Sequence, residues 1–268
     1  MQGRVLIVAG SDSGGGAGIQ ADIKAVTALD GFAATAITAL TAQNTLGVHG
    51  VETVSPAFIE AQMVAVLDDI GADCVKTGML ATAPVIETVV ATLEAHGAGL
   101  PLVVDPVMVA KGGASLLRPD AVDALKTKLL PRAALATPNI PEAEALLGEK
   151  IDSTEAMEEA ARALLDLGPA AVLLKGGHMA GDTLIDVLVG PHGVRKFQCR
   201  RLDTPHTHGT GCTLASAIAV GLAQGLALEP AVARAWAYVQ KAIATAPGLG
   251  AGHGPLNHAH TVTPFKAP

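Results

Sequence analysis

The segment from His208 to Thr213 has the residue types and spacing of an anion-binding turn. It contains Gly209, Thr210, Gly211 and Cys212, and it leads directly into a long Ala/Leu/Ile/Val segment typical of a buried helix. The first backbone N–H groups of a helix have no partner inside it, and glycine lets a ligand approach the backbone closely. The segment therefore predicts a cradle for a phosphate or for charge that develops on a phosphoryl group.

Cys212 is the residue of this segment that could take part in proton transfer. A thiol at a helix N-terminus is the arrangement that lowers a cysteine pKa toward neutrality. Cys212 is therefore predicted to remove a proton from an incoming hydroxyl group. The same residue also fits a small buried cysteine packed at the start of a helix. The segment by itself leaves both interpretations open.

Three charged residues elsewhere follow apolar segments and have prolines or glycines beside them. Lys175 follows Val-Leu-Leu, so it can either reach phosphates as a point charge or extend to the surface. Asp105 and Glu142 have the chemistry to hold magnesium, mostly through water. Alternatively, Glu142 stabilises the start of the helix after Pro141 through the helix dipole. For both carboxylates the metal role is the favoured interpretation.

A glycine-rich loop near the N-terminus indicates an alternative function, the binding of a dinucleotide. Gly16-x-Gly18-x-x-Ala21 formally matches the dinucleotide fingerprint. That fingerprint also expects an acidic residue at the end of the second strand, and here the position is occupied by Gln43-Asn44. A tight loop lining a substrate pocket is therefore favoured over a dinucleotide site. No Gly-x-x-x-x-Gly-Lys-Ser/Thr motif occurs, so ATP would be held by another device.

Apolar runs and helix signals alternate along the chain and must position these residues. Strands are predicted at Val5–Val8, Ala34–Leu40, Cys74–Lys76, Leu102–Val104, Ala134–Ala136 and Ala171–Leu174, followed by an edge hairpin of Leu184–Val189 and Val194–Cys199. Helices are predicted at Ile19–Leu29, Pro56–Ile70, Ala83–His96, Pro119–Leu130, after Pro141, Thr154–Leu167, Gly211–Leu226 and Pro230–Ala246. This alternation predicts a three-layer αβα fold with a mostly parallel central sheet. In such a sheet ligands bind at the carboxyl ends of the strands.

The composition restricts the kind of protein. Half of the 268 residues are hydrophobic, which favours a single domain over 1–268 whose tail, from about residue 248, is loosely structured. The 18 basic residues are outnumbered by 25 acidic ones and form no cluster, so no nucleic-acid partner is expected. Three widely spaced cysteines fit neither a disulfide framework nor a zinc site and indicate the cytoplasm. The apolar stretch Leu214–Leu228 is too short to cross a membrane.

Seven motifs in this order resemble those of the hydroxymethylpyrimidine/phosphomethylpyrimidine kinases of thiamine biosynthesis, which belong to the ribokinase-like superfamily. The motifs are Ala9–Asp12 with Gly14–Asp22, Thr41–Thr45, Lys76–Leu80, Asp105–Met108, Thr137–Glu142, Lys175–His178 and Thr207–Cys212. The resemblance covers nearly the whole chain, as far as Gly252–Pro255. It implies two successive transfers from Mg-ATP, first to 4-amino-5-hydroxymethyl-2-methylpyrimidine and then to its monophosphate.

The resemblance also implies a role for each matching residue. Gln43 would hydrogen-bond the aminopyrimidine edge. The residues packed around the ring would be Gly10, Met79 and Val107. The contacts to ATP would come from Lys175 and Asn139, and the contacts to magnesium from Asp105 and Glu142. The anion hole would comprise Gly209, Thr210 and Gly211, with Cys212 at the position of the base.

Alternatives to this reading remain. The wider superfamily usually has an aspartate as its base, and a cysteine occurs both in the pyrimidine branch and in some bacterial pyridoxal kinases. Cys212 alone therefore does not decide the substrate, although Gln43-Asn44 and Gly78–Leu80 favour the pyrimidine. A catalytically silent pyrimidine-binding regulator is a further hypothesis, against which intact Lys175 and Glu142 argue. Because lids in this superfamily often pair across a dimer, a homodimer is expected.

Overall fold

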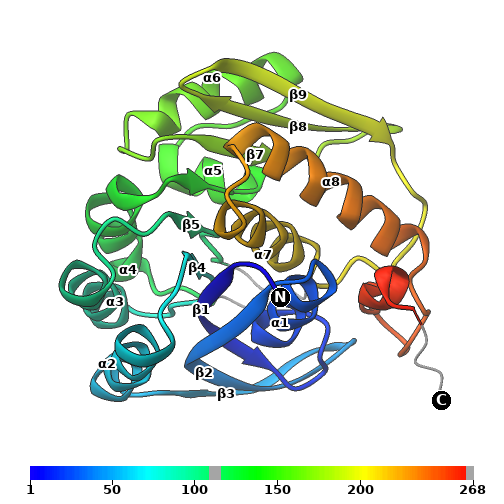
Figure 1. Cartoon of the computed structure of the whole chain (residues 1–268). Helices are drawn as coiled ribbons and strands as arrows, with labels where there is room; N and C mark the ends of the chain where they lie inside the picture. The colour runs from blue at the N-terminus through cyan, green and yellow to red at the C-terminus, as the bar shows by residue number, and fades with distance from the viewer. Residues whose placement is uncertain (109–115, 264–268) are drawn as a thin grey trace.

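The computed structural model describes residues 1–108 and 116–263 (Figure 1). Within these residues the strands form one nine-stranded sheet in the order β3-β2-β1-β4-β5-β6-β7-β8-β9. The strands are β1 (Arg4–Asp12), β2 (Phe32–Asn44), β3 (Gly47–Thr53), β4 (Cys74–Thr77), β5 (Leu102–Val104), β6 (Leu135–Ala136), β7 (Val172–Lys175), β8 (Thr183–Gly190) and β9 (Gly193–Arg200). Pairing is parallel from β2 to β7, and β3, β8 and β9 pair antiparallel at the two edges. The predicted mostly parallel sheet with an edge hairpin is confirmed.

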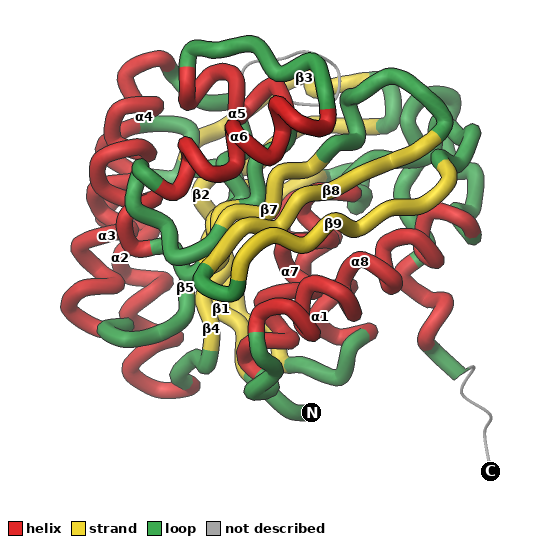
Figure 2. The backbone as a smooth tube through the Cα atoms, turned by 90° about the horizontal axis from the view of Figure 1, so that it is seen from above, coloured by secondary structure: helices red, strands yellow, loops and turns green. Residues whose placement is uncertain are grey.

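Helices cover both faces of the sheet (Figure 2). One face carries α2 (Pro56–Ala65), α3 (Ala83–His96), α4 (Pro119–Ala124), α5 (Ile140–Leu147) and α6 (Thr154–Leu165), and the other carries α1 (Gly18–Ala28), α7 (Thr210–Ala223) and α8 (Leu228–Ala244). Each layer has its own apolar core, because successive residues of a strand point to opposite faces. In β1, Leu6 and Val8 belong to one core, whereas Val5 and Ile7 belong to the other.

The start of α2 is set by the two residues that were predicted to begin it. The hydroxyl of Ser55 accepts a hydrogen bond from the backbone N–H of Phe58 at 3.4 Å, and Pro56 occupies the first turn of α2. Two helices end in a π-helical turn, at Val66–Ile70 after α2 and at Leu125–Leu129 after α4. A short 3-10 helix, Leu130–Arg132, completes the second of these. None of the described helices combines the length and hydropathy needed to cross a membrane.

The β2–β3 hairpin differs from the prediction. Strand β2 continues to Asn44, and β3 returns antiparallel along it. Most residues of β3 are exposed. Because neither face of this strand is buried, Gly47–Thr53 carries no alternation of apolar and polar residues by which a strand would be recognised.

The C-terminal segment also differs from the loose tail predicted from its Gly, Pro and His content. The backbone N–H of His253 donates to the carbonyl oxygen of Thr45 at 2.9 Å, and the carbonyl oxygen of Gly254 accepts from the N–H of His208 at 3.1 Å. Leu256 is buried, and a short 3-10 helix follows at His258–Thr261. Backbone hydrogen bonds to distant loops therefore order this segment as far as the described residues extend, and residues 264–268 lie outside them.

Candidate active site

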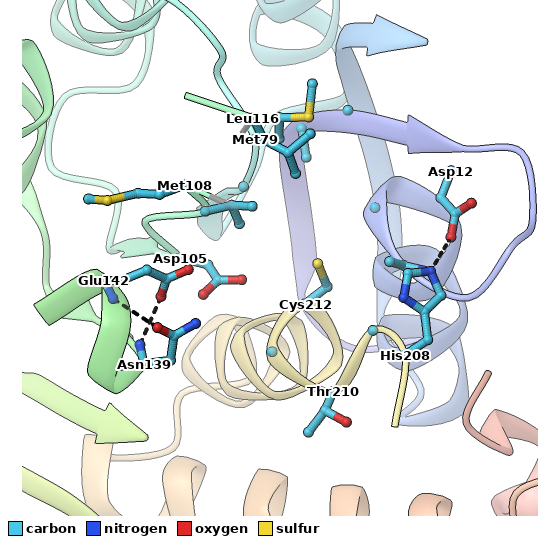
Figure 3. Close-up of a pocket in the computed structure, with 18 of the residues that line it drawn as sticks. Asp12, Met79, Asp105, Met108, Leu116, Asn139, Glu142, His208, Thr210 and Cys212 are labelled. Atoms are coloured by element: carbon cyan, nitrogen blue, oxygen red, sulfur yellow. Dashed lines mark hydrogen bonds and ion pairs between the residues drawn. The ribbon is translucent and has the colours of Figure 1, made fainter. Parts of the chain in front are cut away.

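The predicted site residues lie around one pocket at the carboxyl ends of the parallel strands (Figure 3). The cavity has a volume of about 590 Å³. Its lining includes every residue predicted for the site, namely Gly10, Gln43, Met79, Asp105, Val107, Asn139, Glu142, Lys175, Gly209, Thr210, Gly211 and Cys212. In Figure 3, Asp105 and Glu142 lie on one side of the pocket, Asp12 and His208 lie on the other, and Cys212 lies between them at the start of α7.

The turn before α7 has the geometry that its glycines suggest. Gly209 has φ +81°, and a Cβ at this position would overlap the carbonyl oxygen of Gly16. A Cβ at Gly211 would lie 3.1 Å from the Nζ atom of Lys175. The N–H of Thr210 donates to the carbonyl oxygen of Thr207 over 3.4 Å, and its hydroxyl donates to the same oxygen at 2.8 Å. Gly211 is therefore the residue of the turn that directly meets the charged part of the pocket.

Lys175 and Asp105 form a largely buried ion pair. The Nζ atom of Lys175 lies 2.9 Å from Oδ1 of Asp105, which also accepts a hydrogen bond from the hydroxyl of Thr137 at 3.2 Å. Burial disfavours the charge on Lys175, but the carboxylates of Asp105 and Glu142 more than offset it and raise the lysine pKa. The ammonium group is therefore charged and faces the cavity near Gly211. The pocket-facing role predicted for Lys175 fits this placement better than a surface position does.

Glu142 caps the start of a helix and also faces the pocket. Its side chain accepts a hydrogen bond from the N–H of Asn139 at 2.8 Å, and Oδ1 of Asn139 accepts from the N–H of Glu142 at 2.9 Å. This reciprocal pair caps the N-terminus of α5. Glu142 also lines the pocket, where burial and the nearby Asp105 raise its pKa to about 7 although Lys175 opposes the shift.

The pKa prediction for Cys212 is wrong. Burial raises the pKa of this thiol to about 12; the Lys76 ammonium opposes the rise, whereas Asp22 and Asp105 add to it. The helix N-terminus favours the thiolate, but its effect is confined to the first turn and is smaller than the cost of removing a charged sulfur from water. The sulfur does face the cavity, as the base role requires (Figure 3).

A buried ion pair beneath Cys212 was not anticipated from the sequence. Both carboxylate oxygens of Asp22 lie 2.9 Å from Nζ of Lys76, and Oδ1 also accepts a hydrogen bond from the hydroxyl of Ser216 at 2.7 Å. Asp22 and Lys76 are both fully buried. The Asp22 carboxylate more than offsets the burial of the ammonium and raises the pKa of Lys76. One sequence feature could have indicated this pair. Lys76 lies inside a strand that is otherwise buried on both faces, and a buried ammonium group needs a carboxylate partner.

Asp12 and His208 form a second pair that the sequence did not single out. Nε2 of His208 lies 2.8 Å from Oδ2 of Asp12 and 3.2 Å from the side-chain amide of Gln43. The other oxygen of Asp12 accepts from the N–H of Gly14. Asp12 and His208 belong to two separate sequence motifs, Ala9–Asp12 and Thr207–Cys212, and no contact between them was predicted. A carboxylate after β1 and a histidine before α7 are 196 residues apart, and only the parallel sheet brings them together.

The remaining part of the pocket is apolar. A Cβ at Gly10 would lie 3.3 Å from the sulfur of Met79, so the absence of a side chain at residue 10 makes room for this methionine. Met108 and Leu116 also line the cavity, and Figure 3 labels both of them with Met79. This end has the lining expected for a flat organic ring, whereas the end near Lys175 has the charges expected for phosphates.

A family model and several known proteins match most of the chain. The family model described as phosphomethylpyrimidine kinase matches residues 12–257. The chain is 54% identical to the thiamine biosynthesis bifunctional protein ThiED of Geobacter sulfurreducens, over 96% of this chain and 52% of that protein, so it spans about half of that relative's length. It is 47% identical to the hydroxymethylpyrimidine/phosphomethylpyrimidine kinase of Bacillus subtilis, over 95% and 94% of the two chains. The structure of Staphylococcus aureus pyridoxal kinase with AMP-PCP and pyridoxal superposes with a TM-score of 0.88 at 34% identity, covering 96% of this chain and 94% of that one.

Proposed function

The chain belongs to the phosphomethylpyrimidine kinase family, and on that premise we propose how its pocket carries out the reaction. The activity is the ATP-dependent phosphorylation of 4-amino-5-hydroxymethyl-2-methylpyrimidine to the monophosphate and then to the diphosphate, in thiamine biosynthesis. The assignment of roles rests on one observation: Gln43, Gly211, Lys175 and Cys212 line the same cavity.

In the first transfer, the hydroxymethyl oxygen of the pyrimidine forms a bond to the γ-phosphorus of ATP. The bond from that phosphorus to the bridging oxygen breaks, and ADP leaves with the electron pair. The hydroxyl proton is accepted by the sulfur of Cys212 in its thiolate form. In the second transfer, an oxygen of the monophosphate attacks a second ATP. That oxygen is already ionised at neutral pH, so this step needs no base.

Charge on the transferring phosphoryl group is balanced by Lys175 and by the backbone amides at the start of α7. The amides of Gly211 and Cys212 belong to the first turn, so they have no acceptor within the helix. Lys175 supplies a full positive charge beside Gly211. Alignment and charge compensation of this kind account for most of the acceleration in phosphoryl transfer.

We propose that Asp105 and Glu142 hold magnesium together with the phosphates of ATP. Two buried carboxylates facing one cavity fit this ion, which is commonly bound by one or two carboxylates plus phosphate oxygens. The raised pKa of Glu142 fits as well, since an approaching cation would favour its ionised form. Across residues 1–108 and 116–263, no group of three or more His, Cys, Asp or Glu side chains forms a metal site. When bound, magnesium would neutralise charge on the phosphate oxygens.

Cys212 can act as a base only through a minor ionised form. With a pKa of about 12, nearly all of the thiol is protonated at neutral pH in the free protein. Lys76 is the cation that favours the thiolate, and Asp22 fixes that cation in place. We therefore propose that Lys76 supports the thiolate electrostatically, although it does not bind the substrate.

The assay that tests this function mixes the purified protein with hydroxymethylpyrimidine and Mg-ATP and follows ADP formation. Two equivalents of ADP per pyrimidine are expected, with the monophosphate as an intermediate. No ADP release above the background without pyrimidine would favour the silent regulator instead. The same assay with pyridoxal as the acceptor tests the alternative that the protein is a pyridoxal kinase, because the pyridoxal kinase of Staphylococcus aureus has a similar fold. A higher kcat/KM for pyridoxal than for the pyrimidine would reverse the assignment.

We also propose that the protein is a cytoplasmic homodimer. The β2–β3 hairpin supports a dimer, because β3 has a free edge and the exposed side chains of Leu40, Leu46 and Val51 lie on or beside it. Such an edge is a natural pairing surface. Light scattering during gel filtration would test the dimer, and a monomeric mass at assay concentration would contradict it. The cytoplasm is supported by the use of ATP and by the three unpaired cysteines.

A further inference from the structure

The side-chain amide of Gln43 lies between two groups whose hydrogen-bonding roles are fixed. On one side, Asp12 is 2% exposed and accepts hydrogen bonds from the N–H groups of Gly14, Gly16 and Ala17 at 2.8, 3.1 and 2.8 Å. Burial opposes the charge on Asp12, but these bonds and His208 lower its pKa. Its carboxylate is therefore ionised and can only accept hydrogen bonds.

The carboxylate of Asp12 determines which atom of His208 carries a hydrogen. Oδ2 of Asp12 lies 2.8 Å from Nε2 of the imidazole, so Nε2 must be the protonated nitrogen and must donate. The structure places the amide nitrogen of Gln43 3.2 Å from the same Nε2. Two donors then face each other, and exchanging the nitrogen and oxygen of the amide, which have nearly the same shape, removes the conflict. We therefore assign the carbonyl oxygen of Gln43 to the position nearest His208.

The second neighbour gives the same answer independently. The hydroxyl of Thr41 lies 2.9 Å from the carbonyl oxygen of Ser11, which takes up its one hydrogen. The structure places the amide oxygen of Gln43 3.2 Å from that hydroxyl. With its hydrogen already used, the hydroxyl can only accept here, so the exchanged orientation, with the amide nitrogen nearest Thr41, satisfies this contact as well.

We propose that the Asp12–His208 pair is a positioning device that fixes the orientation of the Gln43 amide and, through it, the direction in which the aminopyrimidine ring binds. This inference rests on the proposed contact between Gln43 and the ring. One hydrogen of the amide nitrogen is donated to Thr41, and one lone pair of the amide oxygen shares the single Nε2 hydrogen of His208 with Asp12 in a three-centre hydrogen bond. The other hydrogen and lone pair remain for the substrate.

The orientation of the Gln43 amide determines where the hydroxymethyl group of the bound pyrimidine points. An aminopyrimidine edge presents a ring nitrogen that accepts and an adjacent amino group that donates, which matches one N–H and one C=O of an amide. The hydroxymethyl group lies on the next carbon beyond the amino group. With the Gln43 oxygen toward His208, the amino group and then the hydroxymethyl group lie toward that residue. His208 directly precedes Gly209, so the reacting oxygen is directed to the start of α7. The opposite amide orientation would turn the hydroxymethyl group away from Cys212.

The test measures how strongly His208 is coupled to the amino group of the substrate. First-transfer kcat/KM is determined for hydroxymethylpyrimidine and for its analogue without the 4-amino group, and the ratio of the two values is the readout. His208→Phe keeps a ring but has no N–H, and the ratio should fall about tenfold, roughly the effect of one hydrogen bond. A general disturbance of the loop lowers both values and cancels in the ratio. In His208→Gln the side-chain nitrogen can replace Nε2, so the ratio should recover to within about threefold of the parent.

Two outcomes separate this inference from the proposed function. If Gln43→Ala abolishes the preference for the amino group but His208→Phe leaves it unchanged, the positioning role is wrong and the contact of Gln43 with the substrate stands. If Gln43→Ala leaves the preference unchanged, the contact itself is wrong, and the inference fails with it. Should His208→Phe not fold, ¹⁵N NMR of the parent protein decides the case: a hydrogen on Nε2 of His208 is expected, and an unprotonated Nε2 would overturn the argument.

Discussion

The pH dependence of the first transfer, compared between the parent and Cys212→Ala, is the sharpest test of the proposed base. Helix position favours a low thiol pKa, whereas burial raises it to about 12. Below its pKa, the thiolate fraction rises about tenfold for each unit of pH. At pH 7.5 the thiolate would be a very small fraction of the molecules, on the order of 10⁻⁵ to 10⁻⁴. The rate constant kcat/KM of the free protein should therefore keep rising between pH 7 and 9 without reaching a plateau.

The second transfer serves as the internal control. Glu142, with a pKa of about 7, ionises over the same range and should increase kcat/KM for both transfers as the pH rises. Dividing first-transfer by second-transfer kcat/KM removes that shared increase, and the ratio should climb about tenfold per pH unit. In Cys212→Ala the ratio should be flat. At pH 9 the first transfer should be slower by on the order of 10²–10⁴-fold, the range for loss of a general base.

The assay couples ADP release to a continuous readout, with the pyrimidine or its monophosphate supplied separately as the acceptor. A ratio that levels off below about pH 9 would show that the helix terminus outweighs desolvation and that the thiol pKa is low after all. Equal losses in both transfers for Cys212→Ala would show that the sulfur positions the acceptor and removes no proton. The rate at which iodoacetamide alkylates Cys212 across the same pH range gives a second measurement of the thiol pKa, which does not depend on turnover. It is made in a Cys199→Ser background.

Further predictions concern binding and stability. Lys175→Ala should slow both transfers by about 10²–10³-fold and raise the KM for ATP, and steady-state kinetics showing an unchanged KM would remove this lysine from the nucleotide site. Asp22→Asn leaves the Lys76 ammonium buried beside a neutral amide and should cost about 3–5 kcal/mol in urea unfolding, whereas the paired change Asp22→Leu with Lys76→Met should cost far less; equal losses would contradict an electrostatic cause. Burial lowers the pKa of His258 to about 4, with Lys24 and His260 adding to the effect, so between pH 7 and 5 the unfolded chain takes up a proton that the folded chain does not. Acidification should therefore cost about 2 kcal/mol of unfolding free energy that His258→Phe does not lose.

The location of the site was predictable because ligands bind at the carboxyl ends of the strands in a parallel sheet. Asp105 and Lys175 were recognised as strand-end residues, and the sheet brings their side chains to within 2.9 Å of each other. Gln43 was found in the same way at the end of β2. Order along the chain suffices for this, since every parallel strand ends at the same edge of the sheet.

Electrostatic detail was not predictable in the same way. The pKa of Cys212 depends on how much water reaches the sulfur and on the signs of Lys76, Asp22 and Asp105 around it, and none of these follows from its place at a helix start. The pairing of Asp12 with His208 was missed for a related reason. Each residue has an ordinary explanation in its own loop, and the contact exists only after residues 196 positions apart have been brought together.

The ordered C-terminal segment joins two pocket loops that lie far apart in the sequence. The backbone N–H of His253 donates to the carbonyl oxygen of Thr45, two residues after the pocket residue Gln43, and the carbonyl oxygen of Gly254 accepts from the N–H of His208 at the pocket wall. Gly252–Pro255 are not among the residues that line the pocket. A substitution in this segment would therefore alter ligand binding only through the loops that the segment holds together.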